Sequence, residues 1–319
     1  MRGIGVEGFG QTPELRNLAV PDPGPGEVRV AIEAAALNPL DLAVASGALA
    51  ALGEYRFPLT LGMDGAGTVT AVGDGVTRFG VGQRVFGQFW GRPLRHGTFA
   101  EACVVQETPE FGALAAAPDG MPGHVAAALP TSGMTALGAL DHMGVAEGGT
   151  LLVIGATGGV GTFAVQAAAV RGLRVVATAA ADVAEEMRAL GADEIVIRGA
   201  EPLEQAVRRV APEGVDAILD TVGDTSLTSG AAGVVRDGGA LFSTAFGIDE
   251  GLLAGRRIRA AHYRLDRKPE RLAALAALVT AGAVRPVVGA EITLEETPRA
   301  LRGELKVTGL RGKTVIRVG

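Results

Sequence analysis

Hydrophobic and polar positions follow two different patterns along the chain. Before residue 125 the apolar runs are short, and residues 27–33 and 68–72 alternate apolar and polar side chains. Alternation with a period of two predicts half-buried β-strands, and further strands are expected at 84–87 and 98–105. Ten of the sixteen prolines lie in this part, a density typical of turns. It is therefore predicted to be a β-rich domain, a partly open barrel.

From about residue 123 short apolar runs alternate with helix-length segments. This order of strand, helix and strand predicts a doubly wound parallel sheet of the α/β class. A last helix is expected at 268–282 and a terminal strand at 313–317. The expected strands of the parallel sheet are 151–154, 175–178, 194–197, 217–220 and 240–243, and its expected helices are 159–171, 182–190, 201–210 and 225–235.

Length and composition restrict the class of protein. The chain has 319 residues, enough for one large or two medium domains, with 48% hydrophobic and 20% charged residues, as in ordinary soluble proteins. No apolar run is long enough to span a bilayer and no signal peptide begins the chain, so a cytoplasmic protein without a membrane partner is expected. Cys103 is the single cysteine, which excludes an internal disulfide. A net charge of −6 without a basic stripe argues against a nucleic-acid partner.

A glycine cluster follows the apolar run 151–154. Gly155, Gly158 and Gly161 lie three residues apart and open a helical pattern, so that Ala156-x-Gly158-x-x-Gly161 matches the dinucleotide fingerprint with alanine in its first place. Small residues permit a sharp turn and a close approach to a pyrophosphate, and a helix start favours an anion. The alternative is a glycine corner without a ligand, but its place at the head of several βα units favours a dinucleotide. The predicted contacts are Ala156, Thr157, Gly158, Gly159, Val160 and Gly161.

The end of the second strand bears on the choice of dinucleotide. Residues 175–181 contain no acid to hold a ribose 2′-hydroxyl. Asp182 follows, but Asp182-x-x-Glu185 has the form of a capping box, which makes Asp182 a helix N-cap. Arg198, after the third strand, is the nearest cation for a 2′-phosphate, with a solvated surface arginine as the alternative. NADPH is therefore predicted, with NADH as the alternative. The predicted contacts here are Thr178, Ala180 and Arg198.

Motifs along essentially the whole chain carry a family resemblance. They include Asn38-Pro39-Leu40-Asp41, Gly62-Met-Asp-Gly-Ala-Gly-Thr-Val69, the glycine turn and Gly312-Lys-Thr-Val-Ile316. The chain resembles the zinc-independent, quinone-oxidoreductase-like branch of the medium-chain dehydrogenase/reductases. The resemblance implies a GroES-like catalytic domain at 1–124 and 262–319, a Rossmann domain at 125–261, a cofactor between them, and a homodimer.

Differences from zinc-dependent relatives indicate a metal-free site. Those relatives need a cysteine and a Gly-His-Glu segment, whereas this chain has Asn38 and Gly62-Met63-Asp64 at the corresponding positions. Its four histidines are scattered and lack the spacing of catalytic zinc ligands. No metal is expected.

Hydride transfer without a metal depends on positioning and on hydrogen bonds to the oxygen that gains charge. The resemblance places Asn38 and Asp41 near the nicotinamide. Their pattern also predicts a capping role, with Asn38 as N-cap, Pro39 first in the helix and Asp41 as the acid of a capping box; one residue can serve in both roles. Tyr55 is a third catalytic candidate, as a donor to a substrate oxygen, with a surface-loop aromatic as the alternative. Relatives often carry tyrosine and arginine where this chain has Ala43 and Ala45, so no proton donor is identified.

Three further segments are predicted to contact the cofactor. Thr135 resembles a family threonine that approaches the nicotinamide, although its hydroxyl can instead bond its own helix turn. The other residues end the fourth and fifth strands, where ligands of this architecture bind. They are Val222, Gly223, Thr244, Phe246 and Gly247.

These features together predict an enzyme. The expected activity is metal-free, NADPH-dependent transfer of hydride to a quinone or an α,β-unsaturated carbonyl. One alternative is an enoyl-thioester reductase, for which Arg92, Arg95, Arg256 and Arg257 are the candidate basic entrance. Another is a non-catalytic NADPH-binding protein of the crystallin kind.

Overall fold

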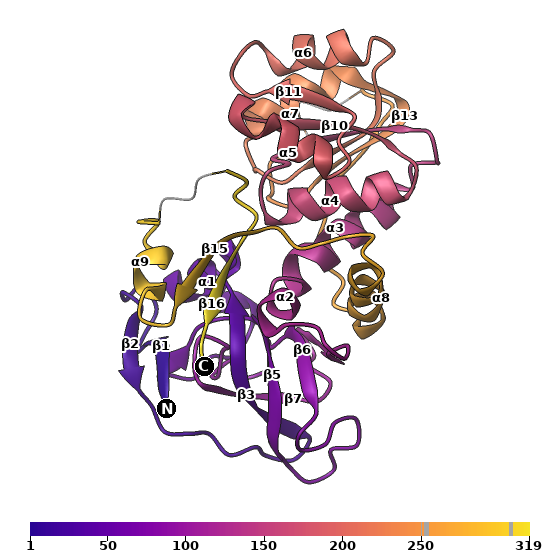
Figure 1. Ribbon diagram of the computed structural model, residues 1–319. Coiled ribbons are helices and arrows are strands. Elements are labelled where there is room, and N and C mark those ends of the chain that lie inside the picture. The colour runs from indigo at the N-terminus through magenta and orange to yellow at the C-terminus, as the bar shows by residue number, and fades with distance from the viewer. Residues whose placement is uncertain (250, 252–254, 306–308) are drawn as a thin grey trace.

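A computed structural model of the chain describes residues 1–249, 251, 255–305 and 309–319. Figure 1 shows two lobes, one built on a parallel sheet and the other on a mainly antiparallel sheet, with α3 (Pro130–Met143) at their junction. The predicted fold class, a doubly wound parallel sheet plus a β-rich domain, is confirmed.

The parallel sheet has six strands in the order β11-β10-β9-β12-β13-β14. Alternate residues of the central strand face opposite sides: Leu151 and Val153 pack with α3 and α4, and Leu152 and Ile154 pack with α6 and α7. Apolar side chains on both faces are the mark of a sheet covered by helices on each side. The strands are β9 (Thr150–Ile154), β10 (Arg174–Ala179), β11 (Glu194–Ile197), β12 (Val215–Asp220), β13 (Val235–Ser243) and β14 (Arg259–His262).

Helices connect these strands as the alternation predicts, with two differences. The helix expected at 182–190 is divided into a 3-10 turn, η2, and the short helix α5, and the helix expected at 225–235 ends in a 3-10 turn, η3. Strand β14 had no counterpart among the expected strands. The helices and turns are α4 (Gly159–Val170), η2 (Ala181–Val183), α5 (Ala184–Ala189), α6 (Leu203–Val210), α7 (Thr225–Ala231) and η3 (Ala232–Val234).

The second sheet joins both ends of the chain. Its order is β15-β16-β3-β5-β6-β8, with β7 also paired to β3, and Ile316 of β16 lies opposite Ala35 of β3. The strand expected at 98–105 begins only at Ala102. The strands are β3 (Glu27–Ala36), β5 (Asp64–Val72), β6 (Arg84–Gln88), β7 (Ala102–Gln106), β8 (Ala113–Ala116), β15 (Val288–Thr293) and β16 (Lys313–Arg317).

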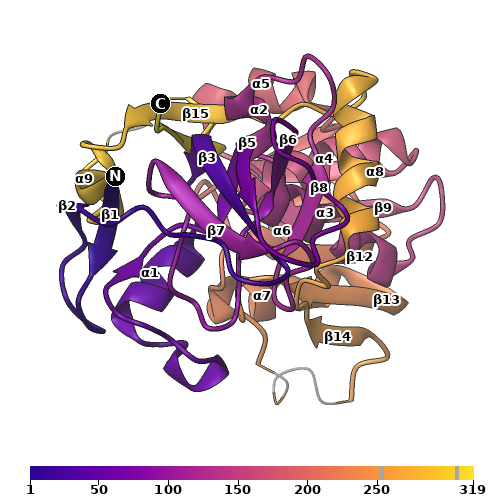
Figure 2. The same cartoon turned by 90° about the horizontal axis from the view of Figure 1, so that it is seen from below.

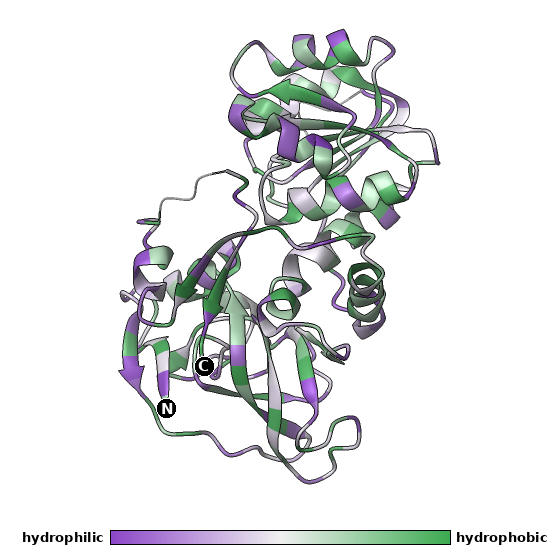
Figure 3. Ribbon diagram, viewed as in Figure 1, coloured by the Kyte–Doolittle hydropathy of each residue, from purple (hydrophilic) through white to green (hydrophobic). Residues whose placement is uncertain are grey.

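Smaller elements complete the lobe. Seen from below in Figure 2, α8 runs beside α3, and a Cβ on Gly133 would lie 2.3 Å from Leu275, so the two helices are in close contact. Hydrophobic residues concentrate in the strands of both sheets (Figure 3). No described helix is long and apolar enough to cross a membrane. These elements are β1 (Arg2–Val6), β2 (Glu14–Asn17), β4 (Leu59–Thr60), α1 (Pro39–Ser46), η1 (Ala50–Leu52), α2 (Gly123–Ala127), α8 (Pro269–Thr280) and α9 (Thr297–Leu301).

Candidate functional site

The glycine turn between β9 and α4 has a backbone that larger residues would disrupt. Gly155 has a φ of 81°, in the left-handed region that glycine adopts without strain. A Cβ on Gly161 would lie 2.3 Å from the carbonyl oxygen of Gly155, so α4 packs directly on the turn. Gly158 is the N-cap of α4 and has no side chain above the helix start. The turn therefore presents backbone rather than side chains.

The start of α4 supplies donors for an anion. The N–H groups of Gly159, Val160 and Gly161 belong to the first turn, where no earlier carbonyl of the helix can accept them. Residues 157–160 are partly exposed, so a ligand can approach them. The helix macrodipole favours negative charge at this end. This backbone cradle fits the diphosphate of a dinucleotide.

The same turn touches the other lobe. Gly312 donates its N–H to the carbonyl oxygen of Thr157 at 2.9 Å, and Gly158 and Gly312 form an isolated parallel bridge. A Cβ on Gly159 would lie 2.8 Å from the Ser132 hydroxyl and 2.9 Å from Cδ of Lys313. The glycine turn, the start of α3 and the start of β16 therefore meet at one point.

Asp220 holds together the loops that follow β12 and β13. The side chain is fully buried, and one carboxylate oxygen accepts the N–H groups of Val222, at 2.9 Å, and Gly223. The other oxygen accepts the Ser243 hydroxyl at 2.6 Å, and that hydroxyl oxygen accepts the Gly247 N–H at 2.9 Å. The two predicted cofactor loops are thereby fixed side by side at the carboxyl edge of the sheet.

Apolar side chains from these loops remain exposed. Val222 is 51% exposed and Phe246 is 61% exposed. Phe246 also has a φ of 61°, a strained value for a side chain of this size. Thr244 donates its hydroxyl to the carbonyl oxygen of Asp220 at 3.2 Å. Ligands of this architecture bind at the carboxyl edge of the parallel sheet, so these exposed apolar side chains lie where a ligand is expected.

The predicted 2′-site lies where β10 and β11 end. Thr178 accepts the Gly155 N–H at 3.0 Å, so its hydroxyl supports the glycine turn. Ala180 is partly exposed and Arg198 is exposed, and the Arg198 N–H donates to the Ala179 carbonyl at 2.8 Å. In the described part of the chain no carboxylate lies within 4.0 Å of the Arg198 guanidinium.

Asp182 does not cap a helix, so that prediction was wrong. It lies inside η2, is exposed, and makes no capping hydrogen bond, while Val183 stands at the N-cap of α5. The reason is the extra 3-10 turn, which carries the chain past the expected cap position before α5 begins. A carboxylate and the Arg198 guanidinium are thus both solvated near the end of β10.

Asn38 and Asp41 form the predicted capping box at the start of α1. The Asn38 N–H donates to the Asp41 carboxylate at 2.8 Å, and Pro39 is the first helical residue. The Asn38 amide has stronger partners elsewhere: its nitrogen donates to Asp64 at 3.0 Å, and its oxygen accepts from the Lys313 ammonium at 2.5 Å. Charged partners attract an amide more strongly than a neutral N–H does. The amide is therefore committed within the protein.

Three charged side chains are buried beside this amide. The Lys313 ammonium lies 3.6 Å from the Asp64 carboxylate and donates to the Leu37 carbonyl at 2.9 Å. Burial raises the pKa of Asp64 and lowers the pKa of Lys313. Burial also raises the pKa of Asp41 to about 7. Asp41 Oδ1 is buried without a hydrogen-bond partner in the described structure.

A chain of hydrogen bonds leads from Asp64 to a cation. Thr131 donates its hydroxyl to Asp64 at 2.6 Å, Gln88 donates to the Thr131 hydroxyl at 2.7 Å, and Arg267 donates Nε–H to the Gln88 oxygen at 2.7 Å. Because arginine can only donate, the Gln88 oxygen must face Arg267 and its nitrogen must face Thr131. In the sequence Asp64 stands out only as a departure from the zinc segment, and no local pattern points to Gln88, Thr131 or Arg267.

The hydroxyls of Tyr55 and Thr135 have partners inside the protein. Tyr55 donates to the Leu49 carbonyl at 2.9 Å, and its ring packs edge-on against Phe9. Thr135 donates to the Thr131 carbonyl at 2.6 Å, which is the within-helix bond considered above. The catalytic roles of Asn38, Asp41 and Tyr55, and the cofactor role of Thr135, stay predictions.

The residues around Met63 do not fit a catalytic zinc ion. Met63 is 2% exposed, and the polar cluster beside it consists of an amide, a hydroxyl, the two carboxylates of Asp41 and Asp64 and an ammonium group. Zinc sites use imidazole, thiolate and carboxylate ligands, and a cation beside the carboxylate opposes a second cation. Within the described residues no group of three or more His, Cys, Asp or Glu is placed to hold a metal ion.

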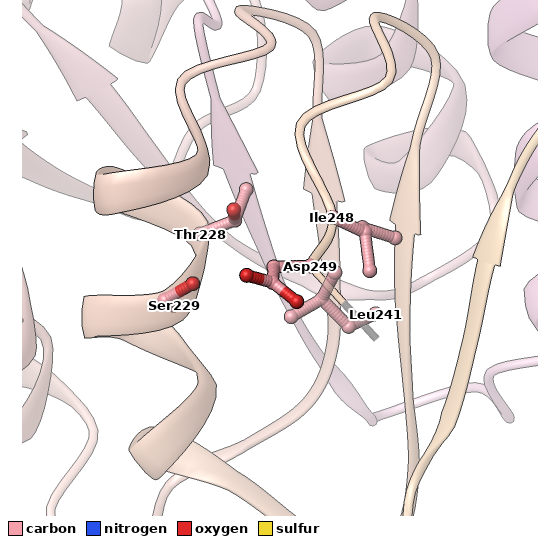
Figure 4. Close-up of a pocket in the computed structure, with 5 residues that line it drawn as sticks. All are labelled: Thr228, Ser229, Leu241, Ile248 and Asp249. Carbon is pink, nitrogen blue, oxygen red and sulfur yellow. The ribbon is translucent and has the colours of Figure 1, made fainter. Parts of the chain in front are cut away.

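Two pockets lie away from the glycine turn. One, between α7 and the loop after β13, is too small for a ligand and is lined by Thr228, Ser229, Leu241, Ile248 and Asp249 (Figure 4). The other has a volume of about 650 Å³ and lies between the end of β8 and α8. Alanines form most of its wall, without the converging polar groups of a binding site. The candidate site is therefore the meeting point of the two lobes.

Comparisons with known proteins agree with this architecture. The alcohol dehydrogenase GroES-like domain model matches residues 24–116, and the zinc-binding dehydrogenase model matches residues 190–316. The mitochondrial NAD(P)H oxidoreductase RTN4IP1 of Mus musculus is 31% identical, over 92% of this chain and 82% of that protein. The chain belongs to the quinone-oxidoreductase-like medium-chain dehydrogenase/reductases. As a member of this family it is an oxidoreductase that uses a nicotinamide cofactor.

Solved structures of family members superimpose over the whole chain. An NAD-dependent alcohol dehydrogenase has a TM-score of 0.87 at 31% identity, covering 100% of both chains. The quinone oxidoreductase of Coxiella burnetii has a TM-score of 0.87 at 25% identity, covering 100% of this chain and 99% of that one. A mycobacterial protein in complex with NADPH has a TM-score of 0.83 at 27% identity, covering 99% of this chain and 100% of that one.

Proposed function

We propose that this protein is a metal-free, NADPH-dependent reductase that transfers hydride to a quinone or an α,β-unsaturated carbonyl. The observation that carries the proposal is the contact of the glycine turn, at Thr157 and Gly159, with the segment Gly312-Lys313 that also holds Asn38. A dinucleotide seated on the turn reaches the polar cluster of the other lobe. The bound nicotinamide supplies the hydride.

The chain's own residues account for cofactor binding in three places. The N–H groups of residues 159–161 receive the diphosphate. The loops fixed by Asp220 and Ser243 line the nicotinamide half. Arg198 receives the 2′-phosphate at the end of β10.

The preference for NADPH rests on charge at the end of β10. Residues 174–181 contain no acid, and Arg198 is exposed and bonded through its backbone N–H to Ala179 at the end of that strand. Asp182 is the opposing charge, and it is exposed as well. Similarity to solved relatives does not decide between NADPH and NADH, since one relative is an NAD-dependent alcohol dehydrogenase and another was solved in complex with NADPH.

The acceptor class follows from the groups at the site. Alcohol oxidation by relatives that use zinc requires a Lewis acid, for which the Asn38, Met63 and Asp64 positions are unsuited. Quinones and enones spread the added charge over a conjugated system, so positioning and hydrogen bonds suffice. The proposal is therefore limited to acceptors of this kind.

Cofactor titration followed by an acceptor panel tests the function. We expect NADPH to raise the melting temperature more than NADH at equal concentration, and small quinones and enones to oxidise NADPH with turnover. Binding without turnover across the panel would favour the non-catalytic alternative. Turnover confined to acyl thioesters would favour the enoyl-thioester reductase.

We further propose a homodimer that acts in the cytoplasm without nucleic-acid or membrane partners. Strand β14 is at one edge of the parallel sheet, and in the described chain nothing pairs with its outer side. Unpaired edges are the surfaces through which sheets associate. Light scattering after size exclusion should give twice the mass of the chain, and a monomer would contradict the proposal.

A further inference from the structure

The side chain of Ser132 lies against the start of α4. Ser132 is the third residue of α3, and its hydroxyl oxygen lies 2.8 Å from the position that a Cβ on Gly159 would take. Gly159 is the first residue of α4, so this oxygen stands beside the backbone that begins the anion cradle. Because Gly159 has no side chain, it leaves the space between the hydroxyl and a ligand on the turn open.

The direction of this side chain agrees with helix geometry. Successive residues of an α-helix point about 100° apart around its axis. Thr131 donates its hydroxyl to the Asp64 carboxylate at 2.6 Å, within the buried polar cluster. Ser132, the next residue, is turned away from that cluster and toward the glycine turn, where it meets Gly159. The start of α3 therefore faces the polar cluster with one hydroxyl and the cofactor cradle with the next.

The Ser132 hydroxyl is almost enclosed but has no protein partner. The residue is 4% exposed, and its oxygen makes no hydrogen bond with the described part of the chain. It is nevertheless not sealed, because the fully enclosed side-chain atoms without a partner among the described residues are Arg16 Nε, Asp41 Oδ1 and His262 Nδ1. The Ser132 oxygen therefore keeps an opening to solvent. A hydroxyl in this position can exchange water for a ligand, which then supplies its hydrogen-bond partner.

The charged group on the other side of Gly159 is bonded within the protein. The stem of Lys313 lies 2.9 Å from the same Cβ position, at its Cδ atom. Its ammonium group points away, to the Leu37 carbonyl at 2.9 Å and the Asn38 amide oxygen at 2.5 Å. Lysine thus borders the cradle with its apolar stem, whereas Ser132 borders it with an O–H group that is free to donate.

We propose that the Ser132 hydroxyl donates a hydrogen bond to the diphosphate of the bound dinucleotide. The inference rests on the proposed reductase function and adds a cofactor contact from α3 to those of the glycine turn. The first-turn N–H groups and the macrodipole of α4 draw the anion to this end of the helix. A hydroxyl that converges on the same anion forms a charge-assisted hydrogen bond. Neighbouring residues of α3, Thr131 and Ser132, then bond Asp64 and the cofactor from one helix start.

Substitution of Ser132 in the full-length protein tests the proposal. Ser132→Ala removes the hydroxyl without adding volume, and the matched control is Ser229→Ala, a change of a partly exposed serine in α7. The Kd for NADPH, measured by cofactor fluorescence, should rise about 10-fold or more in Ser132→Ala, the loss expected for one hydrogen bond to a charged group. The Kd for NADH should rise by the same factor, because both cofactors carry the diphosphate. The control should bind both cofactors as the wild type does.

ADP distinguishes the diphosphate from the nicotinamide half as the partner of Ser132. It carries the diphosphate but lacks the nicotinamide and its ribose. The Kd for ADP, measured by competition with NADPH, should therefore rise in Ser132→Ala by a factor similar to that for NADPH. Weaker binding of NADPH with an unchanged Kd for ADP would place the hydroxyl on the nicotinamide half and overturn the assignment.

Unfolding without cofactor separates ligand binding from a structural role. Because the hydroxyl has no partner in the described chain, Ser132→Ala should melt at the wild-type temperature without cofactor and gain less from added NADPH. If the Kd for NADPH stays within about twofold, or if the variant already melts lower without cofactor and ADP binding is unchanged, the assignment is overturned and the reductase function stands. If the wild type binds neither NADPH nor NADH, the proposed function itself fails, and the role of Ser132 fails with it.

Discussion

Lys313 and Asp64 form an ion pair across the second sheet, with 3.6 Å between Nζ and Oδ2 and side chains that are 3% and 0% exposed. Lys313 begins β16, at the end of the chain, and Asp64 begins β5. The pair stands where the glycine turn meets the other lobe. It links the last strand of the chain to the proposed cofactor site.

Removing the lysine should destabilise the protein strongly. Lys313→Met leaves a buried carboxylate without its cation, and we expect the free energy of unfolding to fall by about 3–5 kcal/mol. The control is Lys268→Met, which removes an exposed ion pair with Asp266 and should change stability by about 1 kcal/mol or less. Urea unfolding measures both. Equal stabilities of the two variants would show that the pair contributes little.

Stability should depend on pH through Asp41. Its pKa rises from 3.8 unfolded to about 7 in the fold, so between these values the folded protein binds the extra proton. This contribution to stability is present below the unfolded pKa and is lost as pH rises through the folded pKa, at about 1.4 kcal/mol per pKa unit. Asp41→Asn should lose less stability than the wild type between pH 4 and pH 7. Parallel stability curves for the two proteins would contradict the shift.

Arg198 should decide between the two cofactors. Arg198→Gln removes the proposed partner of the 2′-phosphate, a charge-assisted bond worth about 1.5–3 kcal/mol, so KM for NADPH should rise about 10-fold or more. KM for NADH should not change, because NADH lacks that phosphate. Arg56→Gln, an exposed arginine paired with Glu54, is the control. Equal changes with both cofactors would remove Arg198 from the 2′-site.

Gly161 should be intolerant of a side chain. In Gly161→Ala the new Cβ meets the Gly155 carbonyl oxygen, so α4 must move away from the turn and the N–H cradle opens. We expect NADPH affinity to fall at least 10-fold, a loss of about 1.4 kcal/mol. Gly230→Ala in α7, where nothing lies within 4 Å, should bind NADPH normally and be slightly more stable. Unchanged affinity in the first variant would place the diphosphate elsewhere.

The sequence predicts those parts of the fold that depend on neighbours along the chain. The spacing of Gly155, Gly158 and Gly161 and the capping box of Asn38 and Asp41 are both local patterns, and the structure has them. The prediction of one helix over 182–190 was wrong at its start, where residues 181–183 form a 3-10 turn before α5. A single 3-10 turn leaves the periodicity of the apolar residues almost unchanged, so the pattern does not reveal it.

The polar cluster depends on pairs far apart in the chain. Nothing near Asp64 in sequence indicates that Lys313 and Thr131 will meet it, since three elements must first assemble. In the sequence His262 is one of four scattered histidines, and β14, the strand that it ends, has no counterpart among the expected strands. Its buried Nδ1 is a property of the assembled edge, which no local pattern specifies.

Turnover of protein stripped with a strong chelator tests the central claim most directly. The account predicts that oxidation of NADPH by a small quinone or enone continues at the untreated rate, and that NADPH supports it better than NADH. Loss of activity on stripping, with recovery on adding zinc, would contradict a metal-free reductase.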